Sequence, residues 1–386
     1  MRDLLMIPGP VEFEPEVLQA LALPTLGHTD PAFIAIFGRA LKRLREVCLA
    51  PSAQPFVVSG SGTLAMELAV ANLVEPGDAA LVVNTGYFSD RMVKILERHG
   101  AKVTQVRAAP GDVPSSDEVE TALAAGGFKL MTLTHVDTST GVLAPVEGLV
   151  RAARKHGVLS VVDGVCATAG EAFHQDAWGA DVYLTASQKA VGVPPGLALL
   201  TVGPLALEAW RKRKAPVASV YADWAEWLPI MEAYEAGKPA YFATPPVNLV
   251  YALDVSLGQI LAEGMEARFA RHRRVALAFR AAWKGLGLRL LPTSDAVASH
   301  LLSALYYPDG VDASFVGQVK AQGVVVAGGL HPDLKSRYFR VGHMNRTGPA
   351  DLLATVGAVE RALLAAGHRV EPGAGLAAAE SALVAR

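Results

Sequence analysis

The sequence predicts an α/β protein, in which a large domain with a mostly parallel sheet sandwiched by helices precedes a smaller C-terminal α+β domain. The chain has 386 residues, enough for two or three domains. Hydrophobic residues make up 51% and charged residues 19%, which fits a deep core and excludes a disordered chain. Between residues 56 and 202, short apolar runs alternate with helical periodicity, which is typical of a parallel sheet covered on both faces.

The elements of the large domain follow from this alternation. The pattern is helical from Pro15, and apolar residues at spacings of three and four predict an amphipathic helix after Asp30-Pro31. Seven apolar runs predict strands at 56–59, 79–83, 103–106, 130–134, 159–163, 181–185 and 197–202. Helices are expected between them at 64–74, 91–98 and 146–156. Ligands of such sheets bind beyond the carboxyl ends of the strands, so the polar residues at those ends are the candidates for function.

The pattern changes after Pro204. A segment rich in proline and aromatic residues, 214–247, leads into a long helical stretch, 248–285, whose charged cluster at 268–274 is interpreted as a solvated helix face. Strands are expected near 288–291, 301–306, 323–327 and 337–342, with helices near 312–321 and 349–366 and a peripheral helix or frayed tail at 373–386. We therefore expect an extended N-terminal segment, a large domain and a small domain at residues 1–14, 15–262 and 263–386.

Composition excludes several classes of protein. Lys+Arg 35 against Asp+Glu 37 leaves no basic excess for nucleic acid. No run approaches the ~18 apolar residues of a membrane-spanning helix, and the N-terminal apolar run is too short for a signal peptide. The two cysteines, Cys48 and Cys166, suit a reducing compartment, and the histidines show no metal-binding spacing. We expect a cytoplasmic protein without a metal site and with neither a membrane nor a nucleic-acid partner.

A glycine turn between a predicted strand and helix is the first candidate site. It runs Ser59-Gly60-Ser61-Gly62-Thr63, and free backbone N–H groups at a helix N-terminus suit an anion. An ordinary strand-to-helix turn explains the same residues equally well. The turn also fits a dinucleotide fingerprint, but that motif needs an acid at the end of the next strand, and Asn84 stands there instead. A single phosphate therefore fits better than a dinucleotide.

Two further candidates follow other strands. Asp163 closes an apolar run, where a carboxylate needs a cationic or hydrogen-bonding partner, although a simple turn with Gly164 would also explain it. Lys189 lies between an apolar strand and a Pro/Gly loop, and a buried lysine readily becomes an amine nucleophile, whereas an isolated lysine is usually a surface residue. A phosphate cradle, an acid and a lysine together are the three requirements of pyridoxal phosphate.

These motifs, in this order, resemble the class V aminotransferases of fold type I, specifically the alanine–glyoxylate and serine–pyruvate group. The resemblance runs from Met6 to about Leu364. The matching segments are 6–10 (MIPGP), 27–33 (GHTDPAF), 59–63 (SGSGT), 140–142 (TGV), 162–163 (VD), 187–190 (SQKA), 194–196 (PPG) and 339–342 (FRVG).

The resemblance implies a role for each matching residue. Lys189 forms the aldimine with pyridoxal 5'-phosphate and then moves the proton between substrate and cofactor, while Asp163 pairs with the pyridine nitrogen. Arg340 grips the substrate carboxylate, for which a planar guanidinium is well suited. The remaining cofactor contacts implied are Ser61, Gly62 and Thr63 at the phosphate, Phe88 stacked on the ring, and Thr138 and Gln188 near the phenolic oxygen. Tyr241 and Thr244 are implied to reach the phosphate in a neighbouring subunit, which implies a homodimer with shared active sites.

The implied activity is transfer of an amino group from alanine or serine to glyoxylate or pyruvate in a ping-pong cycle. The alternatives are an aminotransferase for 2-aminoethylphosphonate or ureidoglycine, or, less well supported, a nicotinamide-binding oxidoreductase. A cysteine desulfurase is disfavoured because neither cysteine lies in the C-terminal third. The loop 136–140 (VDTST) departs from the GESST-like sequence of the group, so Asp137 and Thr138 are expected to alter substrate preference. Cys166 is expected to be a small buried residue or to line the pocket.

Overall fold

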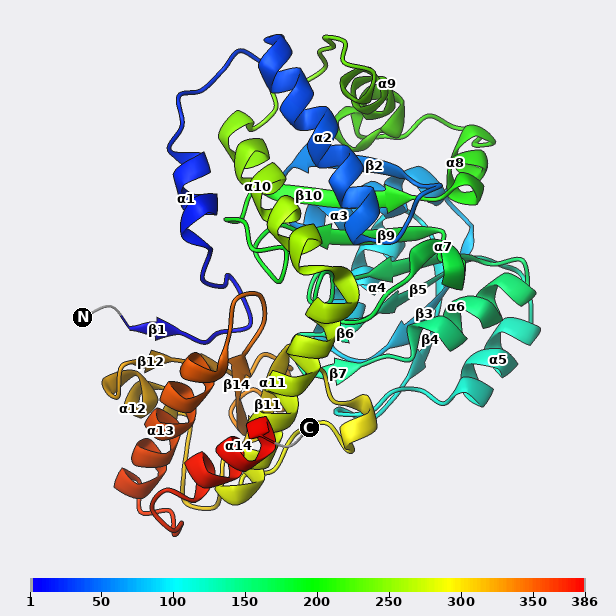
Figure 1. Cartoon of the computed structure of the whole chain (residues 1–386). Helices are drawn as coiled ribbons and strands as arrows, with labels where there is room; N and C mark the ends of the chain where they lie inside the picture. Colours follow the sequence, from blue (N-terminus) through cyan, green and yellow to red (C-terminus); the bar gives the residue numbers. More distant parts are fainter. Residues whose placement is uncertain (1–2, 385–386) are drawn as a thin grey trace.

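The large domain is built on a seven-stranded sheet (Figure 1). The computed structural model describes residues 3–384, so the ends of the expected N-terminal segment and C-terminal tail, 1–2 and 385–386, lie outside it. The strands run in the order β2 (Gln54–Ser59), β10 (Leu197–Val202), β9 (Val182–Ala186), β8 (Leu159–Asp163), β5 (Phe128–Thr134), β3 (Ala79–Asn84) and β4 (Lys102–Arg107). All neighbours are parallel except β10, which is antiparallel to both β2 and β9. All seven predicted strands are confirmed.

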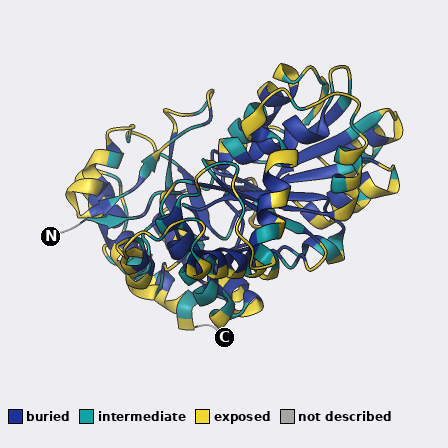
Figure 2. Cartoon of the chain, turned by 90° about the horizontal axis from the view of Figure 1, so that it is seen from above, coloured by how far each residue is buried: buried dark blue, intermediate teal, exposed yellow. Residues whose placement is uncertain are grey.

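Helices cover this sheet and place its apolar residues in one core. The principal ones are α2 (Pro31–Val47), α3 (Gly62–Leu73), α4 (Tyr87–Arg98), α5 (Ser116–Ala124), α6 (Val146–Lys155) and α10 (Val247–Glu263). The shorter ones in this part are α1 (Pro15–Leu21), α7 (Gln175–Trp178), α8 (Pro204–Arg211), η1 (Val220–Ala222) and α9 (Trp224–Glu235). Helix α3 packs on β9 and β10, and α6 packs on β5 and β8. Figure 2 shows the buried residues concentrated along the strands and the exposed ones on the outer helix surfaces.

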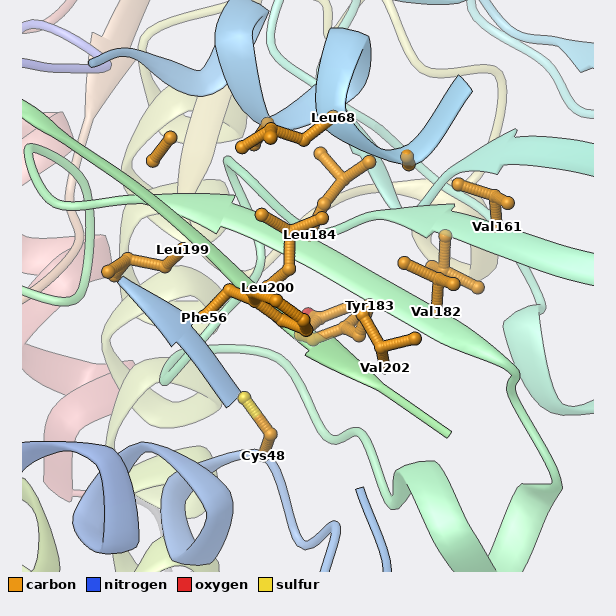
Figure 3. Close-up of a cluster of buried hydrophobic side chains, with 14 of the residues drawn as sticks. Cys48, Phe56, Leu68, Val161, Val182, Tyr183, Leu184, Leu199, Leu200 and Val202 are labelled. Carbon is orange, nitrogen blue, oxygen red and sulfur yellow. The ribbon is translucent and has the colours of Figure 1, made fainter. Parts of the chain in front are cut away.

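Figure 3 shows part of the core, in which Leu184 of β9 lies toward Leu68 of α3, whereas Phe56 of β2, Tyr183 and Leu200 lie on the side of the sheet toward Cys48. The central strands β9 and β10 are buried along their whole length, whereas β4, at the edge of the sheet, is largely exposed. Cys48 belongs to this core, and burial raises the pKa of its thiol to about 12. It is therefore a packing residue and not a nucleophile.

The C-terminal part has its own small sheet and core. Strands β11 (Leu302–Tyr306), β14 (Tyr338–Gly342) and β13 (Ala327–Gly328) form an antiparallel sheet, and β12 (Val324–Val325) pairs with β1 (Leu4–Leu5) near the N-terminus. The helices are α11 (Met265–Gly285), η2 (Asp295–Val297), α12 (Phe315–Ala321), α13 (Pro349–Ala365) and α14 (Ala374–Val384). The strand predicted at 288–291 is wrong, because that segment makes only one isolated bridge, between Leu290 and Leu305.

The long helical stretch differs from the expectation in two ways. It is two helices, because Gly264, with φ +84°, ends α10 and lets α11 start in a new direction. The charged cluster is a solvated face only in part, since Arg273 and Arg274 are exposed but Arg268 and His272 are buried. Met265 and Phe269 pack in the large core, and the second core begins at Val275. We propose that the division between the two domains lies near residues 262–263, with the first turns of α11 docked on the large domain.

In the part of the chain that the structure describes, no helix combines the length and the apolar composition needed to cross a membrane.

Candidate active site

A cavity of about 320 Å³ lies at the carboxyl ends of the parallel strands. Loops that follow β2, β5, β8 and β9 reach it, together with the N-terminal segment at Gly9 and Pro10. This is the edge at which ligands bind in parallel sheets. Eight of the residues singled out in the sequence line the cavity: Ser61, Gly62, Thr63, Phe88, Thr138, Asp163, Gln188 and Lys189.

Lys189 lies in a tight turn that directly follows β9. The backbone N–H of Gly192 donates to Lys189 O at 2.9 Å, and that of Val193 donates to Ser187 O at 2.9 Å. The side chain is buried and its amine donates to the backbone oxygen of Pro8. Burial lowers the pKa of the amine, which favours the neutral, nucleophilic form. Lys189 is therefore not the surface lysine that its type alone suggests.

Asp163 ends β8 and is only 3% exposed. Its Oδ1 accepts the backbone N–H of Val165 at 2.9 Å, so the turn expected from the sequence is present. Burial, which hydrogen bonding offsets only in part, raises the pKa of the carboxyl to about 7. No ion pair to Asp163 is found among residues 3–384. The site thus holds a buried carboxyl that a cationic ligand would stabilise.

The glycine turn places the N-terminus of the twelve-residue helix α3 at the cavity wall. Ser61 occupies the N-cap position, but its hydroxyl accepts no capping hydrogen bond from the backbone of the helix, which leaves it available to a ligand. A Cβ at Gly62 would come within 2.8 Å of Val165 Cγ2, so a larger residue would push against the loop that follows Asp163. Backbone donors and hydroxyls converge here at the positive end of a helix, which favours a phosphate.

Arg91 is a site residue that sequence reasoning missed. Its guanidinium donates to Thr63 Oγ1 at 2.9 Å and lies over the Phe88 ring, 4.8 Å from the centroid. It lines the cavity and adds positive charge beside the glycine turn. The sequence could have indicated Arg91, because it lies one helical turn after Phe88 and therefore on the same face of α4.

The loop after β5 has a different role from the expected one. Asp137 is fully buried, and Oδ2 accepts the N–H of Phe88 at 3.2 Å while Oδ1 accepts the N–H of Ser139 at 2.8 Å. Its side chain therefore fixes Phe88 at the start of α4 and is not among the groups that line the cavity. Thr138 and Val136 do line it, so these two are the positions where this loop can affect specificity.

Three predicted site residues lie outside the cavity of the same chain. Arg340, on β14, is nearest, since its Nη1 donates to Thr138 O at 3.1 Å and its Nε to Gly328 O at 2.9 Å. Tyr241 is 61% exposed, and its hydroxyl lies 3.4 Å from that of Thr244, which is also exposed. The structure therefore brings Arg340 to the edge of the site and leaves Tyr241 and Thr244 on the surface.

The structure also locates Cys166, His135 and His28 relative to the cavity. Cys166 is buried and lines the cavity, and burial raises the pKa of its thiol. His135 does not line the cavity, because its ring is held by the Tyr183 hydroxyl at 3.3 Å. His28 contacts the Tyr241 ring, with 4.9 Å between the centroids.

The groups in the cavity fit pyridoxal phosphate. The helix N-terminus suits a phosphate, the isolated Asp163 suits a protonated ring nitrogen, and the buried Lys189 amine suits an aldehyde. Gln188 Oε1 is buried and has no hydrogen-bond partner in the described part of the chain. Such an orphaned polar atom is expected where a ligand completes the site.

Comparisons with known proteins agree with this geometry. The family model of class-V aminotransferases matches residues 19–335. Alanine–glyoxylate aminotransferase 1 of Saccharomyces cerevisiae is 40% identical, over 89% of this chain and 92% of its own length. L-aspartate–glyoxylate aminotransferase of Paracoccus denitrificans is 33% identical, over 97% and 95%. The crystal structure of ureidoglycine–glyoxylate aminotransferase from Bacillus subtilis superposes with a TM-score of 0.92 at 28% identity, covering 99% of this chain and 98% of that one.

Proposed function

Because this chain belongs to the class-V aminotransferase family and is a transaminase, we propose that it transfers an amino group from alanine or serine to glyoxylate or pyruvate with pyridoxal 5'-phosphate as cofactor. The observation that supports it most is the meeting of Lys189, Asp163 and the glycine turn around one cavity at the carboxyl edge of the sheet. One site would serve both halves of a ping-pong cycle.

In this proposal the cofactor supplies an electron sink for the bond broken at the substrate α-carbon. The protein's residues bind, orient and move protons. Ser61, Gly62 and Thr63 would hold the phosphate, and Asp163 would keep the ring nitrogen protonated. Lys189 would anchor the cofactor, and its amine would take and return the proton of the substrate α-carbon. The lowered pKa of its amine suits this role, because a neutral amine can accept a proton near neutral pH.

Phe88 and Arg340 orient the two ligands. Phe88 offers an aromatic face, fixed by the hydrogen bond from its N–H to Asp137. Arg340 has two of its donors on backbone oxygens, which fixes the guanidinium beside Thr138 and leaves its remaining donors for a carboxylate. An amino acid and a 2-oxo acid share that carboxylate, so one arginine can serve both.

We expect Arg340→Lys to raise KM for both the amino acid and the oxo acid about 10- to 100-fold, the equivalent of losing one charged hydrogen bond of about 1.5–3 kcal/mol. Steady-state kinetics with each substrate varied in turn gives the measurement. Arg337→Lys is the matched control, since Arg337 is an exposed arginine three residues away. A KM unchanged for both substrates would place the carboxylate elsewhere.

We also propose that the enzyme is a homodimer in which Tyr241 and Thr244 complete the neighbouring site. Their exposure supports this, because a large aromatic side chain 61% exposed beside a hydroxyl is available to a second subunit. Neither residue reaches the cavity of its own chain.

The donor and the acceptor are tested together by measuring kcat/KM for a panel of substrates. Alanine, serine, aspartate, ureidoglycine and 2-aminoethylphosphonate would each be paired with glyoxylate and with pyruvate. We expect alanine or serine with glyoxylate or pyruvate to give the highest value. A higher value with aspartate or ureidoglycine would overturn the proposed donor but keep the reaction class, and no transfer from any donor would overturn the proposal.

The nicotinamide alternative finds no support in the geometry. The residue at the carboxyl end of β3 is Asn84, whose amide donates to Asp90 and Gln105 at 2.9 Å. Asp78 lies at the opposite end of that strand, where it pairs with Lys129 at 2.7 Å. A melting temperature that rises with pyridoxal phosphate and does not respond to NAD(H) is the expected result.

A further inference from the structure

The segments that follow Asp163, Lys189 and Arg340 meet at one buried arginine on α11. Arg268 is 5% exposed and makes four hydrogen bonds. Its Nη2 donates to Ala190 O, directly after Lys189, at 2.8 Å. Its Nε donates to Ala169 O, six residues after Asp163, at 2.7 Å. Its Nη2 also donates to Asn345 Oδ1, five residues after Arg340, at 3.1 Å.

The acceptors of these bonds are held in uncommon backbone conformations. Among the described residues, the non-glycine residues with positive φ are Leu49, Ala169 and Asn345, and Arg268 bonds the latter two, at φ +62° and +64°. Such conformations cost about 1–3 kcal/mol each and persist only where surrounding contacts determine them. Arg268 supplies one of those contacts to each loop.

Asn345 extends the cluster to the lysine turn and to the N-terminal segment. A Cβ at Gly192 would lie 2.8 Å from Asn345 Oδ1, so the turn that bears Lys189 packs directly on this side chain. Asn345 Nδ2 donates to the backbone oxygen of Glu12 at 2.9 Å. That segment continues back to Gly9, where a Cβ would lie 2.5 Å from Lys189 Cδ.

The charge of Arg268 is balanced away from the cavity. Its Nη1 pairs with Glu263 Oε2 at 2.8 Å, and Glu263 also pairs with Arg271 at 2.6 Å. Arg268 does not line the cavity, so it touches neither cofactor nor substrate. Its other N–H groups, on Nε and Nη2, donate to the loops around the site. We call this branched set of hydrogen bonds the fork, and the single ammonium of a lysine cannot reproduce it.

From this juxtaposition we infer that Arg268 is a positioning residue, which holds the loops after Asp163, Lys189 and Arg340 in one fixed arrangement. The inference rests on the proposed roles of those three residues. Displacing a reacting group by about 1 Å can cost about 100-fold in rate. Loss of the fork should therefore lower kcat more than it raises KM, because Arg340 keeps its own hydrogen bonds to Gly328 and Thr138.

The test compares Arg268→Lys with Arg280→Lys. Arg280 lies on the same helix, is largely buried and also donates to backbone oxygens, those of Ala298 and Ser299, but within residues 3–384 it makes no hydrogen bond to any of the three loops. Hydrogen–deuterium exchange of cofactor-free protein should show faster uptake over residues 187–193 in Arg268→Lys and no change there in Arg280→Lys. In the loaded enzyme, kcat should fall about 10- to 100-fold in Arg268→Lys alone.

A second variant covers the case in which Arg268→Lys does not fold. In Asn345→Gly, glycine accepts the positive φ without strain while the side-chain bonds to Arg268 and Glu12 are lost. Faster exchange over 187–193 is expected here as well. Wild-type exchange over 187–193 in a folded variant, or the same increase in Arg280→Lys, would overturn the inference. Because exchange needs neither cofactor nor substrate, this result is independent of whether the proposed transamination is observed.

Discussion

Lys189→Ala is expected to lower kcat about 10⁴-fold or more, because the variant loses both the group that anchors the cofactor and the base that moves the α-proton. The amine is suited to both roles by burial, which lowers its pKa. Removing it leaves a void beside Gly9, whose ideal Cβ position lies 2.7 Å from the Lys189 amine. A small primary amine added to the assay should enter this space and restore part of the activity.

The matched control for this variant is Lys129→Ala. Lys129 pairs with Asp78 at 2.7 Å and is the second residue of β5, at the edge of the sheet opposite the cavity, so its loss should leave kcat unchanged. Both variants would be checked for a single thermal transition before assay. Turnover by Lys189→Ala within tenfold of the wild type, without added amine, would contradict the assignment of Lys189.

The sheet could be predicted from the sequence because its central strands are buried on both faces and read as short apolar runs. Strand β9 is buried throughout, and the predicted run 181–185 differs from it by one residue. The C-terminal part was harder, since the leucines of 288–291 are present for a different reason. Leu288 and Leu291 fill two separate small cores, and only Leu290 makes a bridge. Hydrophobic periodicity predicts which residues are buried, but it does not predict which other strand a segment pairs with.

The site was predictable where a functional residue ends a strand, as Asp163 does, or lies in the turn after one, as Lys189 does. It was not predictable where the contact comes from a distant segment. Gly9 lies against Lys189 although the two are 180 positions apart in the sequence. Arg268 was taken for a surface residue because a run of charges usually marks a solvated helix face. Three-dimensional structure alone shows that its partners are backbone oxygens at 169 and 190.

Asp163→Asn is expected to have opposite effects on activity and on the stability of the cofactor-free protein. Removing one member of a buried charge pair costs about 3–5 kcal/mol, so loss of the carboxylate facing the ring nitrogen should lower kcat about 10²- to 10³-fold. Without the cofactor, the same carboxylate is buried and lacks an ion-pair partner in the described chain. Its ionisation then opposes folding.

The sign of the pH dependence follows from the direction of this shift. Burial raises the pKa of the folded carboxyl from 3.8 to about 7, so the folded state holds the proton more tightly than the unfolded state does. In the cofactor-free wild type, the contribution of this carboxyl to stability is therefore fully present below about pH 4 and is lost as the pH rises to about 7. A shift of three pKa units corresponds to about 4 kcal/mol of unfolding free energy. Asp163→Asn should recover this free energy at pH 8, where the wild-type carboxyl is ionised, but not at pH 4.

Melting temperatures of cofactor-free wild type and Asp163→Asn at pH 4.5, 6 and 8 give the measurement, with kcat of the loaded enzymes alongside. Asp181→Asn is the control, because Asp181 is also a buried carboxyl with a pKa raised by burial, but it accepts from Ser160 N at 2.8 Å at the far end of the sheet. That variant should change stability with pH and leave kcat intact. Either of two results would contradict the proposal: wild-type kcat in Asp163→Asn, or a lower melting temperature of this variant at pH 8. The carboxylate would then not pair with a protonated ring nitrogen, and the proposed orientation of the cofactor would be wrong.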